Sequence, residues 1–208
     1  MIILIRHGEA EGATGRAIGH TDLPLSRKGE IQAQQIAEAM AGNNFKTFLC
    51  SPLTRTMQTA SYIKKTCSIS PSPCPDFAEI NLGKWDGLNY ETIKKEFPEE
   101  YRKRGQDFSG YRPPEGESFL DLKKRVRNTF HKLAEDRQPV LIVTHAGVIR
   151  VLMHLVLDFP LENIFRIKPS HCYATVLLST SKGYSLKAFN IPPGNDLKSL
   201  LAALMPQP

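Results

Sequence analysis

The chain has 208 residues, of which 41% are hydrophobic, and a formal net charge of +6 at pH 7. This length suits one domain, 1–208, with a substantial core, and the apolar runs are far shorter than the roughly 20 residues of a membrane-spanning helix. The positive charge favours anionic partners, but it falls in short clusters that alternate with acidic residues, which is typical of solvated helix faces rather than of a nucleic-acid-binding surface.

The first elements alternate between strand and helix. Residues 1–5 form an apolar run that indicates a buried strand, and this run is too short for the core of a secretory signal, so we expect a cytoplasmic protein. Ser26 is placed to cap a helix that runs to about residue 41. A second strand over 45–50 and a helix after Pro52 follow. The apolar stripe of the Ser26-capped helix is expected to contain Ile31, Ile36, Ala37 and Met40.

Two stretches interrupt this alternation. Residues 68–75 contain three prolines in eight positions, which predicts an irregular surface connection. Residues 88–114 begin with a helix-compatible pattern and end in a segment rich in glycine, arginine and aromatic residues. Long insertions on a compact domain are often functional, so we expect residues 88–114 to form a lid.

The alternation resumes after Ser118. An amphipathic helix is predicted there, and its basic cluster 123–125 is interpreted as solvated surface. The apolar run 140–144 indicates a buried strand, which His145 follows directly, and a further helix begins after that histidine.

The last part of the chain predicts two strands, 173–180 and 184–189, joined by a tight turn at one side of the sheet. The tail 191–208 is expected to dock a short helix onto the domain. This order of elements predicts an α/β fold, namely a three-layer α/β/α sandwich with a mostly parallel central sheet and an inserted lid.

Several strand ends carry residues that suit phosphate chemistry. Arg6 and His7 follow the first strand, Arg55 lies shortly after the second, and His145 follows the strand 140–144. The carboxyl ends of parallel strands share one edge of a sheet, where α/β proteins bind ligands. We therefore expect two imidazoles and two guanidiniums to converge there.

The residue types then indicate roles. Neutral imidazole is a good nucleophile, so His7 is predicted to accept a phosphoryl group, with its uncharged form favoured by neighbouring Arg6 and Arg55. These two arginines and His145 are predicted to bind the phosphate oxygens. The sequence shows no motif for a metal site, and we expect no metal or cofactor. The four cysteines form no CxxC pair.

Six motifs in family order resemble the histidine phosphatase (phosphoglycerate mutase-like) superfamily. They are Leu4-Ile-Arg-His-Gly-Glu9, Gly19-His-Thr-Asp-Leu-Pro-Leu-Ser26 with Gly29, Ser51-Pro-Leu-Thr-Arg-Thr-Met-Gln-Thr-Ala60, Glu79-Ile-Asn-Leu-Gly-Lys-Trp-Asp-Gly87, Glu115-Gly-Glu-Ser118 and Val143-Thr-His-Ala-Gly-Val-Ile-Arg150. The resemblance implies a metal-independent phosphomonoester hydrolase that acts through a phosphohistidine on small-molecule esters. It also implies that Glu79 is the acid, with Asp76 and Asp86 as alternatives.

Within that superfamily, the resemblance leaves several reactions open. Mutases carry a longer insertion than 88–114, so hydrolysis is favoured over a phosphoglycerate mutase reaction. The segments 83–87 and 144–150 are similar to those of α-ribazole phosphatases, which remove a 5′-phosphate during cobalamin assembly. Other open substrates are sugar phosphates, fructose 2,6-bisphosphate and a broad range of monoesters. The aromatic residues of the lid either stack on a benzimidazole base or pack against the core.

One departure from the family pattern keeps a second class open. Family members commonly carry polar residues at the positions of Ala10 and Ala13, and Thr14 or Thr21 is expected to supply a replacement hydroxyl. A less completely lined pocket would lower the activity or shift the orientation of the substrate, and the two alanines also keep open a non-catalytic phosphate-binding adaptor domain.

The remaining candidates receive structural interpretations. We expect Arg150 to make an ion pair, and we expect packing roles for the other histidines, with His171 held as a neighbour of the site. The oligomeric state stays open, and a homo-oligomer is compatible with the sequence.

Overall fold

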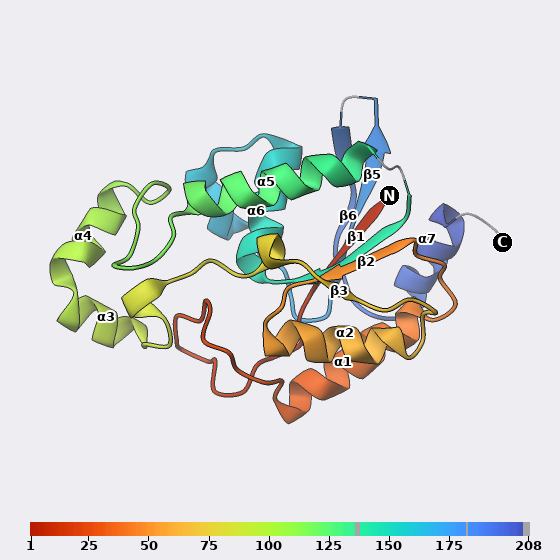
Figure 1. The fold of residues 1–208 in the computed structure, drawn as a ribbon, viewed down its shortest axis with the longest axis horizontal. Helices are drawn as coiled ribbons and strands as arrows, with labels where there is room; N and C mark the ends of the chain where they lie inside the picture. The colour runs from red at the N-terminus through yellow and green to blue at the C-terminus, as the bar shows by residue number, and fades with distance from the viewer. Residues whose placement is uncertain (136–137, 182, 206–208) are drawn as a thin grey trace.

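A computed structural model describes residues 1–135, 138–181 and 183–205 (Figure 1). Its centre is a six-stranded sheet in the order β3-β2-β4-β1-β5-β6. The strands are β1 (Ile2–Arg6), β2 (Thr47–Cys50), β3 (Ser72–Pro73), β4 (Val140–Thr144), β5 (Ala174–Thr180) and β6 (Gly183–Ile191). The pairs β3-β2, β2-β4 and β4-β1 are parallel, whereas β5 runs antiparallel to both β1 and β6. The sheet is therefore mostly parallel, as predicted.

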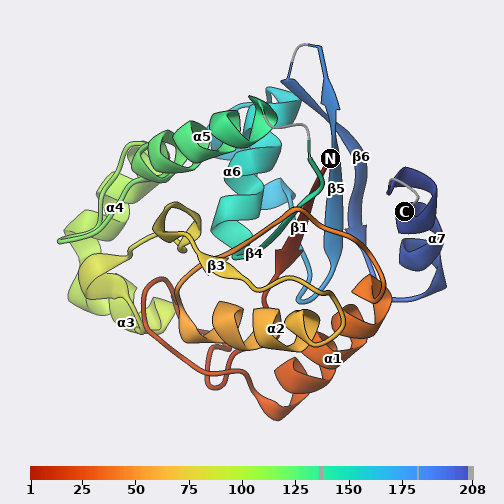
Figure 2. The same ribbon diagram turned by 45° about the vertical axis from the view of Figure 1, so that its right-hand side comes forward.

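Helices cover both faces of this sheet. The α-helices are α1 (Arg27–Met40), α2 (Thr54–Lys64), α3 (Tyr90–Glu96), α4 (Pro98–Gln106), α5 (Phe119–Glu135), α6 (Ala146–Leu157) and α7 (Asn195–Leu204). Three 3₁₀ turns are η1 (Pro75–Phe77), η2 (Gly83–Trp85) and η3 (Leu161–Arg166). Figures 1 and 2 show α1 and α2 on one side of the sheet and α5 and α6 on the other. The fold is the predicted three-layer α/β/α sandwich.

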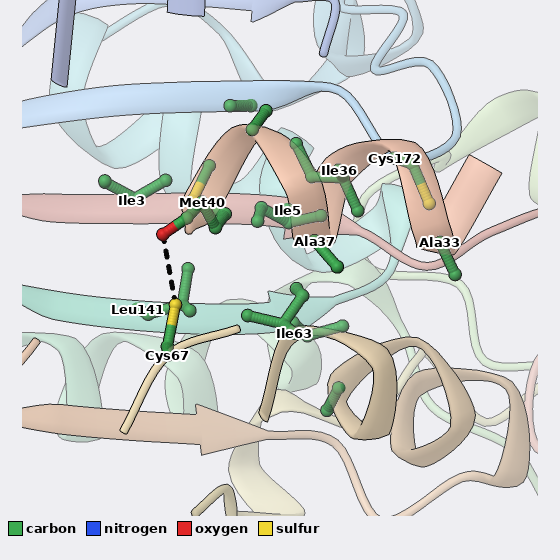
Figure 3. Packing of buried hydrophobic residues seen from close by; sticks show 14 of the residues in the cluster. Ile3, Ile5, Ala33, Ile36, Ala37, Met40, Ile63, Cys67, Leu141 and Cys172 are labelled. Carbon is green, nitrogen blue, oxygen red and sulfur yellow. Dashed lines mark hydrogen bonds between the residues drawn. The ribbon is translucent and has the colours of Figure 1, made fainter. Parts of the chain in front are cut away.

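The alternation of side chains along β1 explains the two cores. Ile3 and Ile5 point into the core under α1, α2 and α7, while Ile2 and Leu4 point into the core under α5 and α6. Figure 3 shows Ile3 and Ile5 among the apolar side chains of α1. All four isoleucine and leucine side chains are fully buried, because a strand with helices on both faces has no solvated side.

The helix α1 begins where the sequence predicts and differs in one residue of its inward face. The Oγ of Ser26 accepts the Gly29 N–H at 3.1 Å and caps the helix. Ile36, Ala37 and Met40 are buried, but Ile31 is 48% exposed. At 3.6 residues per turn, Ile31 lies about 140° around the helix from Ile36. The prediction that Ile31 belongs to the apolar stripe is therefore wrong.

The proline-rich segment 68–75 also differs from expectation, because it contains the short edge strand β3. Leu49 pairs with Ser72 in parallel, and the Cys74 N–H donates to the Cys50 carbonyl at 2.7 Å. Prolines are tolerated here because an edge strand leaves one row of its backbone groups unpaired. A proline-rich segment is therefore compatible with a two-residue strand at the edge of the sheet.

The lid segment 88–114 holds the two helices α3 and α4, which lie at the end of the molecule far from β5 and β6 in Figure 1. It packs on a small third core built around Trp85, Ala17 and Ile93. Aromatic rings of Phe97, Tyr101 and Tyr111 lie 5.5 to 6.5 Å from the Trp85 ring between centroids. Aromatic packing thus anchors residues 88–114 on this third core, and Phe108 also packs against the core under α5 and α6.

At the C-terminal end, β5 and β6 form the predicted antiparallel pair, although residue 182 of their turn lies outside the described residues. The helix α7 docks through buried Leu197 and Leu201, as expected for the described part of the tail. No helix in the described ranges is long and apolar enough to cross a membrane.

Candidate active site

The carboxyl ends of β1 and β4 lie side by side and bring the two predicted histidines together. Arg6 pairs with Thr144 across the parallel strands, and the His7 N–H donates to the Thr144 carbonyl at 2.9 Å. The rings of His7 and His145 are buried and lie 5.0 Å apart between centroids. The shared sheet edge is therefore the position of the candidate site.

The main chain selects the tautomer of His7. The Nδ1 atom lies 2.6 Å from the Gly8 carbonyl oxygen, which can only accept, so Nδ1 carries the proton and Nε2 keeps its lone pair. Burial, and then the charges of Arg55 and Arg6, hold the pKa of His7 well below its usual value. The imidazole is therefore neutral near pH 7 and has a free nucleophilic nitrogen.

Both predicted arginines are held by backbone carbonyls. Arg6 donates from Nη1 to the Pro169 carbonyl at 2.9 Å, and Arg55 donates to the carbonyls of Thr21 at 2.9 Å and Gly19 at 2.7 Å. Among the described residues, neither buried Nε–H has a hydrogen-bond partner. Burial lowers the pKa of Arg6 to about 10, so both guanidiniums remain charged near pH 7 and available to an anion.

A carboxylate fixes the loop that holds Arg55. Asp86 accepts hydrogen bonds from the backbone N–H groups of Gly19, His20 and Thr21, and from the Thr21 hydroxyl at 2.6 Å. Although burial would raise the pKa of Asp86, these hydrogen bonds hold it below its usual value. The carbonyls of Gly19 and Thr21 are thereby aimed at Arg55.

Glu79 lies in the loop after η1 and is only 7% exposed. Its carboxylate accepts the Gly147 N–H at 3.1 Å and the Ile80 N–H at 3.0 Å. A Cβ on Gly147 would lie 2.2 Å from Oε1 of Glu79, so only glycine leaves room for the carboxylate. The start of α6 and the loop after η1 therefore fix the predicted acid from two sides.

The two alternative acids are committed elsewhere. Asp76 accepts the Thr129 hydroxyl of α5, and Asp86 is saturated by the loop 19–21. Neither residue lines the cavities described below. This geometry favours Glu79 over both alternatives.

His145 is held by a hydroxyl rather than by the main chain. Its Nε2 lies 2.7 Å from Oγ of Ser51, and its Nδ1 is buried with no hydrogen-bond partner in the described part of the chain. Burial, followed by the charges of His7, Arg55 and Arg6, keeps its pKa well below the usual value. A neutral His145 that accepts the Ser51 hydroxyl proton at Nε2 has Nδ1–H as a free donor.

Two cavities meet at Glu79. The first, of about 330 Å³, is polar and is lined by Arg6, Arg55 and His7. It is called here the phosphate cavity, after the role predicted for these residues. The second, of about 220 Å³, has seven aromatic residues among the 18 that line it and is called here the aromatic cavity. Ile18, Glu79, Tyr90 and Arg150 line both. The aromatic side chains of the second cavity are Trp85, Tyr90, Tyr101, Phe108, Tyr111, Phe119 and Phe165.

Comparison with known proteins agrees with this geometry. The model of the histidine phosphatase superfamily, branch 1, matches residues 2–192. The chain belongs to this superfamily. It is a phosphatase by the same match and by its phosphatase relatives.

Two curated relatives and one solved structure illustrate the likeness. An adenosylcobalamin/alpha-ribazole phosphatase of Escherichia coli K12 is 28% identical over 83% of this chain and 87% of its own length. A 6-phosphofructo-2-kinase/fructose-2,6-bisphosphatase of Arabidopsis thaliana is 34% identical over 86% of this chain, but the match spans only 24% of that protein. The crystal structure of a putative alpha-ribazole-5′-P phosphatase from Escherichia coli gives a TM-score of 0.85 at 26% identity, covering 93% of this chain and 98% of the other.

The departure from the superfamily pattern can now be located. Ala10 and Ala13 line the phosphate cavity, and so does Thr14. The hydroxyl of Thr21 is bound to Asp86 and does not line either cavity. Of the two replacement hydroxyls considered, Thr14 alone is therefore placed to take part.

Three residues belong to the site more closely than the sequence suggested. Arg150 lines both cavities, and its Nε donates to the Ile167 carbonyl at 2.9 Å; no salt bridge of its side chain is present among the described residues, so the predicted ion pair is wrong. His171 lines the phosphate cavity 5.6 Å from the His7 ring, and burial lowers its pKa to about 4. Arg16 lines the same cavity and was not singled out. Their positions in the cavities depend on contacts between segments distant in sequence, and only His171 was expected near the site.

Proposed function

We propose that the chain hydrolyses phosphate monoesters without a metal ion, through a phosphohistidine at His7. The observation that carries this proposal is the buried, neutral His7 beside Arg6 and Arg55, with Nδ1 bound to the Gly8 carbonyl. A lone pair on Nε2 among fixed cations suits attack on a phosphoryl group.

In the first step, His7 Nε2 forms a bond to phosphorus and the phosphorus–oxygen bond to the leaving group breaks. Arg6, Arg55 and His145 stabilise the negative charge on the equatorial oxygens. Glu79, which lies where the two cavities meet, donates a proton to the departing oxygen.

In the second step, the carboxylate of Glu79 accepts a proton from water, and the water oxygen forms a bond to phosphorus. The phosphorus–nitrogen bond breaks, which restores neutral His7 and releases inorganic phosphate. The same carboxyl group thus serves as acid and then as base, and it ends each cycle protonated as it began.

We propose α-ribazole 5′-phosphate as the substrate. The aromatic cavity beside Glu79 offers ring surfaces for a benzimidazole base, and a relative of this activity is matched over nearly its whole length. A second phosphate, as in fructose 2,6-bisphosphate, needs free cations. The two arginines that line the aromatic cavity pack over aromatic rings instead. Arg104 lies 4.9 Å from the centre of the Phe108 ring, and Arg150 lies 4.9 Å from that of the Phe165 ring.

We further propose that residues 1–208 act as one domain in the cytoplasm, with 88–114 as a lid over the leaving group. Tyr90, Tyr101 and Tyr111 of this segment line the aromatic cavity, which supports the lid role. The docked α7 shares a core with α1, which supports a single domain.

The test is phosphate release in the presence of a chelator. The substrates are α-ribazole 5′-phosphate, fructose 2,6-bisphosphate, 3-phosphoglycerate and 4-nitrophenyl phosphate, and His7→Ala is the control. We expect chelator-resistant release that is fastest from α-ribazole 5′-phosphate and lost in His7→Ala.

The other outcomes separate the alternatives. Preference for fructose 2,6-bisphosphate would overturn the substrate and keep the mechanism, whereas isomerisation of 3-phosphoglycerate would indicate a mutase. Phosphate binding without turnover would overturn the enzymatic proposal in favour of an adaptor domain, the role to which Ala10 and Ala13 point.

A further inference from the structure

Arg125 of α5 is turned inward, although its basic cluster 123–125 was interpreted as solvated surface. Its side chain is 20% exposed and uses all five of its N–H donors. Nη1 donates to the carbonyls of Asp76 at 2.7 Å and Ala78 at 2.9 Å, and Nη2 donates to the carbonyl of Glu79 at 2.8 Å. One guanidinium therefore ties down the backbone that leads into the proposed acid.

Glu117 completes this arrangement from the other side of the acid. It accepts two hydrogen bonds from Arg125, at 2.9 Å to Oε1 and 3.0 Å to Oε2, which form a bidentate pair. Its Oε2 also accepts the Asn81 N–H at 2.9 Å, and its own N–H donates to the Asn81 carbonyl at 2.7 Å. The pair thus binds the backbone at residues 76, 78 and 79 and again at residue 81.

The electrostatic setting favours the charged form of Glu117. Burial would raise the pKa of Glu117, but the hydrogen bonds from Arg125 and from the Asn81 N–H lower it below its usual value. Half-buried ion pairs contribute little net stability, because desolvation offsets their attraction. Arg125 and Glu117 make seven hydrogen bonds, two with each other and five with the backbone of residues 76–81. Their main effect is to hold this backbone in one geometry rather than to add free energy of folding.

All five N–H donors of Arg125 are bonded to protein groups and its side chain lines neither cavity, so it has no donor left for the substrate. We infer that Arg125, paired with Glu117, is a positioning residue that holds Glu79 in place to protonate the leaving oxygen. The inference rests on the proposed role of Glu79 as the acid. Proton transfer requires hydrogen-bond reach to the leaving oxygen, and small displacements of a catalytic group cost large factors in rate.

A comparison of leaving groups tests this role. An alkoxide leaving group needs a proton, whereas 4-nitrophenolate is stable enough to leave without one. The ratio kcat/KM includes only the steps up to departure of the alcohol, so it isolates the acid role of Glu79 from its role with water. The measurement is kcat/KM for α-ribazole 5′-phosphate, or glycerol phosphate if that is a better substrate, and for 4-nitrophenyl phosphate.

The variants are Arg125→Gln, Arg125→Lys, Glu79→Gln and the double variant Arg125→Gln with Glu79→Gln. Exposed Arg127, on the same helix, supplies the matched control Arg127→Gln. We expect Glu79→Gln to lower kcat/KM for the alkyl ester by about 100-fold or more, with a much smaller loss for the aryl ester. Arg125→Gln should show the same selectivity at about 10-fold or more, and Arg125→Lys should recover part of it.

The double variant provides the sharpest outcome. If Arg125 acts through Glu79, adding Arg125→Gln to Glu79→Gln should cause little further loss on the alkyl ester. Equal losses on both esters, or full additivity in the double variant, would overturn the inference and leave Arg125 a structural residue. Absence of a selective loss in Glu79→Gln would instead refute the proposed acid. If Arg125→Gln fails to fold, Arg125→Lys, alone and combined with Glu79→Gln, carries the same test, because lysine keeps the charge but cannot reproduce the bidentate pair and the three carbonyl contacts.

Discussion

At the scale of single residues, Gly147 has no side chain and so leaves room for the carboxylate of the proposed acid, Glu79. The N–H of Gly147 binds Oε2 of Glu79, and a Cβ at Gly147 would come within 2.2 Å of Oε1. Gly8 has a similar part beside the proposed nucleophile, because a Cβ there would lie 2.5 Å from the Gly29 carbonyl. Close packing around the two reacting groups leaves each with one orientation.

The substitution Gly147→Ala tests this close packing. We expect the methyl group to displace the Glu79 carboxylate and to lower kcat/KM for an alkyl phosphate by about 100-fold, the low end of a general acid's contribution. The control is Gly105→Ala in α4, where nothing lies within 4 Å of the added Cβ. That variant should keep its activity and gain up to about 1 kcal/mol in free energy of unfolding. Unchanged activity in Gly147→Ala would show that the carboxylate does not need this position.

At the scale of elements, loops rather than helices orient the cations of the site. The backbone after η2 supplies Asp86, whose carboxylate holds the loop 19–21, and that loop directs two carbonyls to Arg55. The segments are distant in sequence and are joined by these hydrogen bonds. The helix α2 therefore places the backbone of Arg55, and this chain of contacts orients its guanidinium.

The variant Asp86→Asn should loosen this chain of contacts. An amide oxygen replaces only one of the two carboxylate oxygens, so at least one charged hydrogen bond to the loop 19–21 is lost, which costs about 1.5–3 kcal/mol. If that energy appears in phosphate binding, the inhibition constant of inorganic phosphate should rise by roughly 10-fold or more. Competition against 4-nitrophenyl phosphate measures it. Asp107→Asn, which alters a lid carboxylate that accepts the Gly110 N–H, is the matched control and should leave the constant unchanged.

At the scale of the whole molecule, the sheet separates two apolar cores and leaves the histidines at one of its edges. Burial, and then the nearby positive charges, hold the pKa values of His7 and His145 well below the usual 6.5. Folding therefore keeps both rings neutral, while the unfolded chain binds a proton at each ring below about pH 6.5. Burial of the site links stability to pH.

The sign of this linkage gives a prediction. Stability is retained above the unfolded pKa, near 6.5, and is lost as the pH falls toward the lower folded values. His171, whose pKa burial lowers to about 4, contributes with the same sign. We expect the free energy of unfolding to decrease by about 1.4 kcal/mol per pH unit for each of these three histidines between pH 6 and pH 5. Urea denaturation at pH 7.5 and 5 measures the loss. The double variant His7→Asn with His145→Asn should remove most of it, and an unchanged pH dependence in that variant would contradict the linkage.

The sequence by itself determined the layered fold and the four residues at the sheet edge. Apolar runs identify the strands, and Arg6, His7 and His145 directly follow two of them, while Arg55 lies in the turn region after another. Parallel strands end at one edge, so these residues meet whatever the details of packing. Ile31 is an exception of another kind, because its apolar character suggested burial although its helical spacing from Ile36 places it on the exposed side.

Only the tertiary structure decided how the site is supported. The inward turn of Arg125, the placement of His171 and Arg150 in the cavities, and the engagement of Thr21 by Asp86 all join segments far apart in sequence. A basic cluster on a helix has the same local pattern whether its arginine meets water or three backbone carbonyls. Such contacts follow from the three-dimensional packing of α5 against the loop at Glu79, and no local periodicity encodes that packing.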